Sequence, residues 1–227
     1  MAKTTVSAPG ADDDDQRRTE HLLRFVLGGP GRGHSSSGDL PIQGRIGVKI
    51  RDGRACIIEV RCETDFTART PDFGKLIDDL LDICLEQEPG PIVLNQRILD
   101  RIDEAHRRCG EHISLIRGEL LRGERFGSYL HHDWRLGVLV QVEGGSIDGE
   151  TLTGLCIHVA AHLPPPLVVS PEDIAKLVGM QTKRKDAEEV TLLNQLYVKD
   201  PSGKNRVKDV LPKGVKILKF VRYLLGE

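Results

Sequence analysis

The stretch IIEVRCETDFTART, residues 57–70, carries the strongest structural signal in this 227-residue sequence. Apolar residues alternate with polar ones in its first half, at Ile58, Val60 and Cys62. This period of two predicts a β-strand. At its end, Thr70 precedes a proline, an arrangement typical of a helix N-cap and first helical residue. The residues between the strand and the helix, 64–66, are therefore expected in a surface loop.

Two interpretations of that loop remain open from the residues alone. In the first and more common arrangement, Phe66 folds back over the preceding strands and Asp65 closes a turn. In the second, Asp65 and Phe66 form an acidic and aromatic wedge that contacts a partner.

The alternation also extends upstream of this stretch. Ile46, Val48 and Ile50 are spaced as in a strand, and Asp52-Gly53 is a strong signal for a two-residue hairpin turn. The chain from Gly44 to Cys62 is therefore predicted to form a β-hairpin.

Two helices and a strand follow the hairpin. Apolar residues at helical spacing predict a helix from Pro71 to about Glu88, which the PGP sequence at 89–91 ends. A second helix is predicted from Asn95 to Cys109, with Gly110 beyond its end, and His112–Leu121 is predicted to be a strand.

The chain from Phe126 onward repeats this plan. The predicted elements are a hairpin of Ser128–His132 and Leu136–Val142, helices over Gly149–His162 and from Ser170, and closing strands at Leu196–Val198 and Lys216–Leu225. We predict an α+β fold of two similar lobes, residues 44–122 and 123–227, each with a β-hairpin, helices and a closing strand.

Residues 1–43 differ from the rest in composition. An acidic run at 12–15 and the glycine- and serine-rich segment GGPGRGHSSSGD cannot build a core, which predicts a disordered, low-complexity tail. A helix over Arg17–Leu27 would be marginal on its own in water.

Composition excludes several classes of function. The 32 basic and 34 acidic residues nearly cancel, and aromatic residues make up only 4%, so neither a general electrostatic attraction to nucleic acid nor a stacking platform for single strands is expected. The sequence contains no apolar run long enough to cross a membrane and no secretion signal at its start. We expect a cytoplasmic protein with no membrane contact and no specific nucleic-acid partner.

No metal or cofactor is expected. The five cysteines are an odd number without a C-x-x-C motif, which indicates reduced thiols. His158 and His162 lie four residues apart on a predicted helix, but no third ligand is evident. The set His106, Cys109 and His112 would straddle a helix end, where ordinary surface histidines are commoner than ligands.

Six segments, in order, resemble bacterial elongation factor Ts. They are IIEVRCETDFTART, GEHISLIR, GSYLHHDWRLGVLV, CIHVAAHLPP, LLNQLYVKD and VKILKFVRYLLGE. The resemblance covers about residues 44–227 and implies the two-lobed α+β core of that family, in agreement with the repeated plan.

The resemblance also implies a function and a set of contact residues. The family stimulates GDP release from elongation factor Tu, acting as a guanine-nucleotide exchange factor and not as an enzyme of covalent chemistry. Asp65 and Phe66 match the pair that inserts near the switch region of elongation factor Tu and disturbs its magnesium site. His131 matches a histidine that contacts the phosphate side. Cys109 stands where the family carries an isoleucine that packs on the same partner.

The sequence departs from the family pattern in one further respect. Nothing in residues 1–44 matches the T-G-A-G-x-x-D-C-K-x-A-L signature of the helical domain with which members of the family begin. Exchange remains the leading hypothesis, and this departure motivates an alternative: a divergent paralogue that acts as a protein-binding adaptor without effective exchange. The sequence is also compatible with a homo-oligomer.

Overall fold

The structure, a computed structural model, describes residues 42–162, 166, 168–170 and 191–227. The predicted tail falls outside this range except for Ile42 and Gln43, and Gln43 already begins the first strand. The predicted helices at Arg17–Leu27 and from Ser170 also lie outside the described residues, apart from Ser170 itself.

The predicted hairpin is confirmed. Strands β1 (Gln43–Arg51) and β2 (Arg54–Cys62) pair antiparallel from end to end. Asp52 and Gly53 connect them with φ angles of 51° and 70°. Positive φ at both central residues defines the type I′ turn, which matches the twist of the strands it joins.

Helix α3 (Pro71–Cys84) begins as predicted, with the Thr70 side chain accepting a hydrogen bond from the Phe73 amide. It ends earlier than the predicted Glu88. Arg54 on β2 donates hydrogen bonds to the carbonyls of Leu85 and Gln87, at 3.0 and 2.6 Å. These carbonyls no longer need helical partners, so the chain can turn away before the proline is reached.

Helix α4 (Gln96–Cys109) also agrees with the prediction. The Asn95 side chain caps its first turn, and Gly110 ends it in the left-handed region at φ 75°. Strand β4 (Ser114–Arg122) then pairs with β2, and the two-residue strand β3 (Gly90–Pro91) pairs with β4. The resulting sheet has the order β1-β2-β4-β3.

The second sheet has the order β5-β6-β7, from Arg125–Leu130, Leu136–Glu143 and Lys216–Leu224. Helix α5 (Gly149–Ala161), the 3-10 turn η2 (Leu192–Asn194) and the short helix α8 (Val207–Val210) pack outside it. In both sheets the closing strand pairs antiparallel with the second strand of the hairpin. The α+β fold with two similar lobes is thus confirmed, and the predicted boundary at 122/123 falls between β4 and β5.

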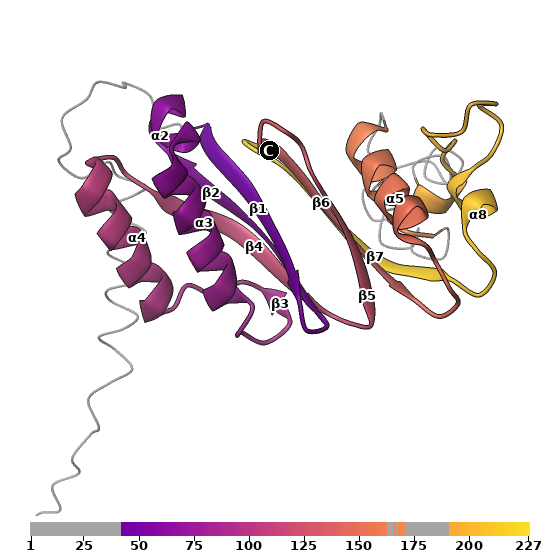
Figure 1. The fold of residues 1–227 in the computed structure, drawn as a ribbon, viewed down its shortest axis with the longest axis horizontal. Helices are drawn as coiled ribbons and strands as arrows, with labels where there is room; N and C mark the ends of the chain where they lie inside the picture. The colour runs from indigo at the N-terminus through magenta and orange to yellow at the C-terminus, as the bar shows by residue number, and fades with distance from the viewer. Residues whose placement is uncertain (1–41, 163–165, 167, 171–190) are drawn as a thin grey trace, which may run out of the picture.

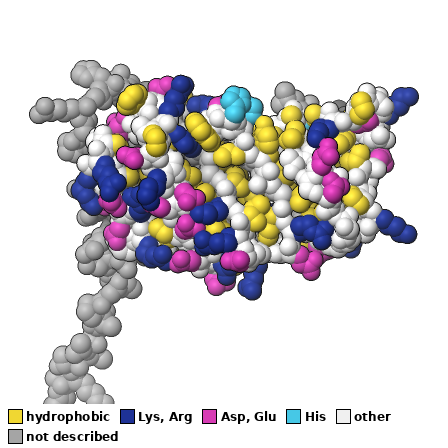
Figure 2. Space-filling view, in the orientation of Figure 1, with side chains coloured by type: hydrophobic (Ala, Val, Ile, Leu, Met, Phe, Trp, Pro, Cys, Tyr) yellow, Lys and Arg dark blue, Asp and Glu magenta, His cyan; other side chains and the backbone are white. Residues whose placement is uncertain are grey.

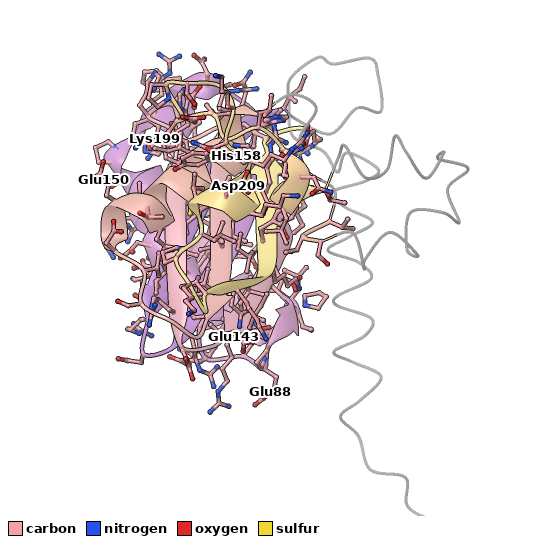
Figure 3. The ribbon with its side chains drawn as sticks, turned by 90° about the vertical axis from the view of Figure 1, so that its right-hand side faces the viewer. Glu88, Glu143, Glu150, His158, Lys199 and Asp209 are labelled. Atoms are coloured by element: carbon pink, nitrogen blue, oxygen red, sulfur yellow. The ribbon has the colours of Figure 1, made fainter. Side chains whose placement is uncertain are left out.

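The predicted strand at Leu196–Val198 is wrong. Leu196 makes only an isolated bridge with Arg206. The Val198 amide donates to the ring Nδ1 of His158 at 3.2 Å, and the Tyr197 amide donates to the Asn205 carbonyl. These contacts bind the segment to α5 and to its own following loop, so it joins no sheet. Figure 3 views this outer cover of the second sheet, with His158 labelled.

The two sheets pack face to face, with helices on the outer side of each (Figure 1). Between them lies a buried cluster made of Ile46, Ala55, Ile57, Leu139 and Leu225. Gly137 on β6 makes this approach possible, because a Cβ at that position would lie 2.4 Å from the side chain of Ile46. The described residues therefore form four layers: helices, sheet, sheet, helices.

A buried ionic cluster also joins the sheets. The fully buried carboxylate of Glu59 accepts hydrogen bonds at 2.7 Å from Arg61 and from Arg117, and at 3.2 Å from the Gly226 amide. Arg117 reaches the second lobe as well, donating to the Leu224 carbonyl at 3.1 Å.

None of the helices in the described part of the chain is long and apolar enough to cross a membrane.

Candidate functional site

Asp65 and Phe66 lie on a short helix. The residues predicted as a loop form α2 (Asp65–Arg69), in which the Thr64 side chain accepts a hydrogen bond from the Thr67 amide. Phe66 is 79% exposed, the highest value among the large hydrophobic residues that the structure describes. The interpretation in which this ring folds back over the hairpin is therefore wrong, because the ring projects from the helix into solvent.

Asp65 occupies the first turn of α2, where a negative charge interacts favourably with the helix dipole. Its carboxylate lies 3.4 Å from the guanidinium of Arg69, one helical turn later, and both side chains are largely exposed. Together with Phe66 and Thr70, this pair lines a surface hollow of about 350 Å³. Asp65 is thus a helix residue with an accessible carboxylate, not the closing residue of a turn.

Glu111, one residue beyond Gly110, fixes the start of α2. Its carboxylate accepts hydrogen bonds from the hydroxyls of Thr64 and Thr67, both at 2.6 Å, and from the Thr64 amide at 3.1 Å. Partial burial opposes the charged form, but these hydrogen bonds hold the pKa of Glu111 below its ordinary value. The helix that carries Phe66 is therefore attached to the segment that follows α4.

Cys109 is the last residue of α4, two residues before Glu111, and it is exposed. Its thiol borders a groove of about 120 Å³ between α3 and α4. The apolar residues of the groove are Phe73, Leu76, Ala105 and Ile113. A side chain at position 109 can therefore contact a molecule that covers the end of α4 and the base of α2.

His131 lies in the turn between β5 and β6, one residue after the end of β5. Its ring Nδ1 is 2.8 Å from the Tyr129 hydroxyl. Its backbone amide donates to the Leu136 carbonyl, and its carbonyl accepts from the Trp134 amide. The turn is docked on the first sheet, because the Ile46 amide donates to the Trp134 carbonyl at 2.7 Å.

The structure brings these segments to one end of the molecule. In Figure 1, α2 and the turn between β5 and β6 lie at the same end of the two sheets, and histidine side chains gather at this edge in Figure 2. A cavity of about 310 Å³ separates α2 from the turn and is lined by Asp65 on one side and Trp134 on the other. Asp65 and Phe66 on α2 therefore share one hollow, and α2 faces the turn that carries His131 across the cavity lined by Asp65 and Trp134. Cys109 lies on the neighbouring groove, which shares Thr70 with the hollow.

The chemistry of this surface is that of contact. It presents a protruding aromatic ring, a carboxylate and an imidazole beside apolar hollows. Within the described ranges, no group of three or more His, Cys, Asp or Glu side chains is arranged to hold a metal ion. Both ring nitrogens of His158 are engaged by Gln195 and Val198.

Sequence reasoning missed the residues that support the site. Glu111 and Thr64 brace α2, and Arg45 on β1 connects α2 to Trp134. Two signals were present in the sequence: Arg45 is a charge directly before the alternating apolar residues of the first strand, and Trp134 is the single tryptophan of the chain. Neither signal specifies which residue the side chain contacts.

Comparison with known proteins agrees with the geometry. The family model described as "Elongation factor TS" matches residues 63–185. The chain is 33% identical over 222 residues to elongation factor Ts of Stutzerimonas stutzeri, covering 84% of this chain and 74% of that protein. It is 29% identical to the proteins of the same name from Photobacterium profundum and Lactiplantibacillus plantarum, covering 96% and 95% of this chain and 83% of each relative.

Proposed function

This chain belongs to the elongation factor Ts family of translation elongation, and we propose that it accelerates the release of GDP from elongation factor Tu in the cytoplasm. It does so as a nucleotide-exchange factor, without covalent chemistry. The observation that carries the proposal is the 79% exposure of Phe66 on a helix that is braced at its start.

Burial of this exposed ring against the partner supplies the free energy that exchange needs. A factor that binds the nucleotide-free partner more tightly than the GDP-bound partner weakens GDP binding by the same ratio. Burying a phenylalanine side chain contributes about 1.5–3 kcal/mol. Since about 1.4 kcal/mol corresponds to a factor of ten, a ring buried only in the nucleotide-free complex weakens GDP binding by roughly one to two powers of ten.

Asp65 and His131 act beside the ring. A carboxylate pushed toward the elements that support a phosphate-bound magnesium ion competes with the partner's own contacts to that ion. His131 lies on the turn at the other side of the cavity, and that turn is docked on the first sheet through Trp134. Cys109 completes the surface beside α2.

The test is the release rate of fluorescent GDP from the cognate elongation factor Tu as this protein is titrated. We expect acceleration by the wild type, a loss of about tenfold or more in Phe66→Ala, and a loss in Asp65→Ala. Val93→Ala is the control, because Val93 is 51% exposed but lies between β3 and α4, away from α2.

Each result has a definite meaning. Equal rates for wild type and Phe66→Ala would remove Phe66 from the mechanism. If calorimetry detects binding to elongation factor Tu but wild type does not accelerate GDP release, the protein is an adaptor and the exchange proposal is wrong. Absence of binding would reject the partner itself.

A further inference from the structure

We propose that Arg45 is a positioning residue that clamps α2 to the turn between β5 and β6, and that Trp134 is the other half of the clamp. The clamp would hold Phe66 and His131, which belong to different lobes, in one fixed arrangement. Its role in nucleotide exchange rests on the proposed function, whereas its existence in the free protein does not.

Arg45 engages the carbonyl end of α2. The side chain is only 9% exposed, and its Nε donates a hydrogen bond to the Ala68 carbonyl. Its Nη2 donates to the Thr70 carbonyl at 3.3 Å. A positive charge at this end of a helix binds a carbonyl that has no partner inside the helix, here that of Ala68, and complements the helix dipole. The Thr70 carbonyl also accepts a hydrogen bond from the Gly74 amide in α3. Glu111 holds the start of α2, and Arg45 holds its end.

The same guanidinium stacks on the tryptophan of the other lobe. Its central carbon lies 3.8 Å from the centroid of the Trp134 ring, well inside the range of a cation–π contact. The backbone of Trp134 is fixed at the same place, because its carbonyl accepts a hydrogen bond from the Ile46 amide at 2.7 Å. Ring and backbone of one residue are therefore both bound to adjacent residues of β1.

Two features indicate that this arrangement is built into the fold. Trp134 has a φ of 59°, in the left-handed region that residues other than glycine rarely occupy, so surrounding contacts must hold it there. Gly74 lies inside α3, where a Cβ would come within 3.1 Å of Nη1 of Arg45. A glycine at this position leaves room for the guanidinium. Burial lowers the pKa of Arg45, but an arginine remains protonated in proteins.

The clamp would reduce the entropy that binding must offset. Without it, α2 and the turn could each reorient, and a partner would have to order both before contacting Phe66 and His131 together. His131 is connected directly to the clamp, because its carbonyl accepts a hydrogen bond from the Trp134 amide at 2.8 Å. The effect on exchange would therefore pass through the geometry of the surface, not through contact of Arg45 with the partner.

The free protein tests the clamp without any partner. Trp134 is the only tryptophan, so its emission reports directly on the stacked guanidinium. We expect Arg45→Met to shift the emission of Trp134 and to increase amide hydrogen exchange within residues 65–69. Arg51→Met is the matched control, because Arg51 lies on the same strand and pairs with Asp82 away from α2. If Arg45→Met and Arg51→Met leave the emission and the exchange of α2 equally unchanged, the clamp does not exist.

GDP release from elongation factor Tu tests the positioning role. We expect Arg45→Met and Trp134→Ala to raise the half-saturating concentration about tenfold. Arg45→Lys should raise it less, because lysine keeps the charge. Trp134→Phe should stay near wild type, because phenylalanine keeps an aromatic face. In a double-mutant cycle, Arg45→Met should add little to Phe66→Ala. If Arg45→Met raises the half-saturating concentration by the same factor in the wild type and in Phe66→Ala, its role is merely structural and the proposal is overturned.

The two proposals can fail separately. If wild type does not accelerate GDP release, the proposed function is wrong, and fluorescence and hydrogen exchange still decide whether the clamp exists. If Phe66→Ala abolishes exchange while folded Arg45→Met and Trp134→Ala match wild type, the proposed function stands and the positioning role is wrong.

Discussion

The hydroxyl of Thr64 donates a hydrogen bond of 2.6 Å to the carboxylate of Glu111, 47 residues further along the chain. This contact joins the N-cap of α2 to the segment that follows α4. A helix of five residues cannot sustain itself in water, because nucleation costs more than so few hydrogen bonds return. The presentation of Phe66 therefore depends on a tertiary contact and not on local helix propensity.

Glu111→Ala should loosen α2. The change removes the acceptor of three hydrogen bonds from Thr64 and Thr67, and we expect a loss of about 2 kcal/mol in the free energy of unfolding. The Ala68 amide, which donates to the Thr64 carbonyl, should exchange faster with solvent deuterium. Urea titration and hydrogen exchange measure both effects. Exposed Glu124 provides the control, and identical protection of Ala68 in both variants would contradict the bracing role.

Cys109→Ile should strengthen partner binding. Isoleucine buries more apolar surface than cysteine beside the groove between α3 and α4, a gain of about 1 kcal/mol. This corresponds to a decrease of about fivefold in the half-saturating concentration for GDP release from elongation factor Tu. Cys109→Ser keeps the size and serves as the control. A half-saturating concentration unchanged or raised by isoleucine would place position 109 outside the contact.

Glu59→Gln should be strongly destabilising. The carboxylate is fully buried between Arg61 and Arg117, so its neutralisation leaves two guanidinium groups without their counter-charge at the junction of the sheets. Removing one partner of a buried ion pair typically costs about 3–5 kcal/mol. Glu119→Gln is a close control on β4. The Glu119–Lys219 pair also joins the two lobes, at 2.6 Å, but Lys219 is half exposed, and we expect a loss below about 1 kcal/mol in urea unfolding. Similar losses for the two variants would contradict the special role of burial.

His158 should make stability depend on pH. Burial lowers its pKa to about 4, opposed by the hydrogen bond with Gln195 and assisted by His162. In the unfolded chain a histidine has a pKa of about 6.5. Below that pH the unfolded state takes up a proton that the native state does not accept. The free energy of unfolding therefore decreases as the pH falls from about 6.5 toward about 4. The slope is about 1.4 kcal/mol per pH unit at most.

Urea unfolding at several pH values measures this slope. His158→Gln should flatten it between pH 6.5 and 4.5, where carboxylates contribute least, even if the variant is less stable throughout. Exposed His132 is the control, and His132→Gln should keep the wild-type slope. A slope that persists in His158→Gln would assign it to another group.

The strands and the two longer helices of the first lobe could be predicted because their signals are local. Alternation around Asp52-Gly53 fixed the hairpin, and Thr70, Asn95 and Gly110 marked helix ends. The helix α2 could not be predicted, since Thr64-Asp65-Phe66 has weak helix propensity and Glu111 supplies the missing stabilisation from a distance.

The second lobe contains the clearest error for the same reason. Leu196-Tyr197-Val198 has the composition of a strand, but the ring of His158 accepts the Val198 amide, so a partner 40 residues away removes it from any sheet. Of the site itself, the sequence placed Asp65 and Phe66 at the surface. It did not place the turn that carries His131 opposite α2, because that arrangement depends on Arg45 and Trp134 meeting across two sheets.

The packing of the two sheets has a consequence for how the chain is made. The inner face of the first sheet, with Ile57 and Glu59, is covered by residues that include Leu225 and Gly226, and the bond between Gly226 and Glu59 spans 167 residues. At a translation rate of about 5–20 residues per second, roughly 10 to 30 seconds pass between the synthesis of Glu59 and that of Gly226, the last part of its cover. During this interval, the nascent first lobe carries an incompletely covered apolar surface. The surface that later unites the lobes is then the one through which neighbouring unfinished chains would aggregate.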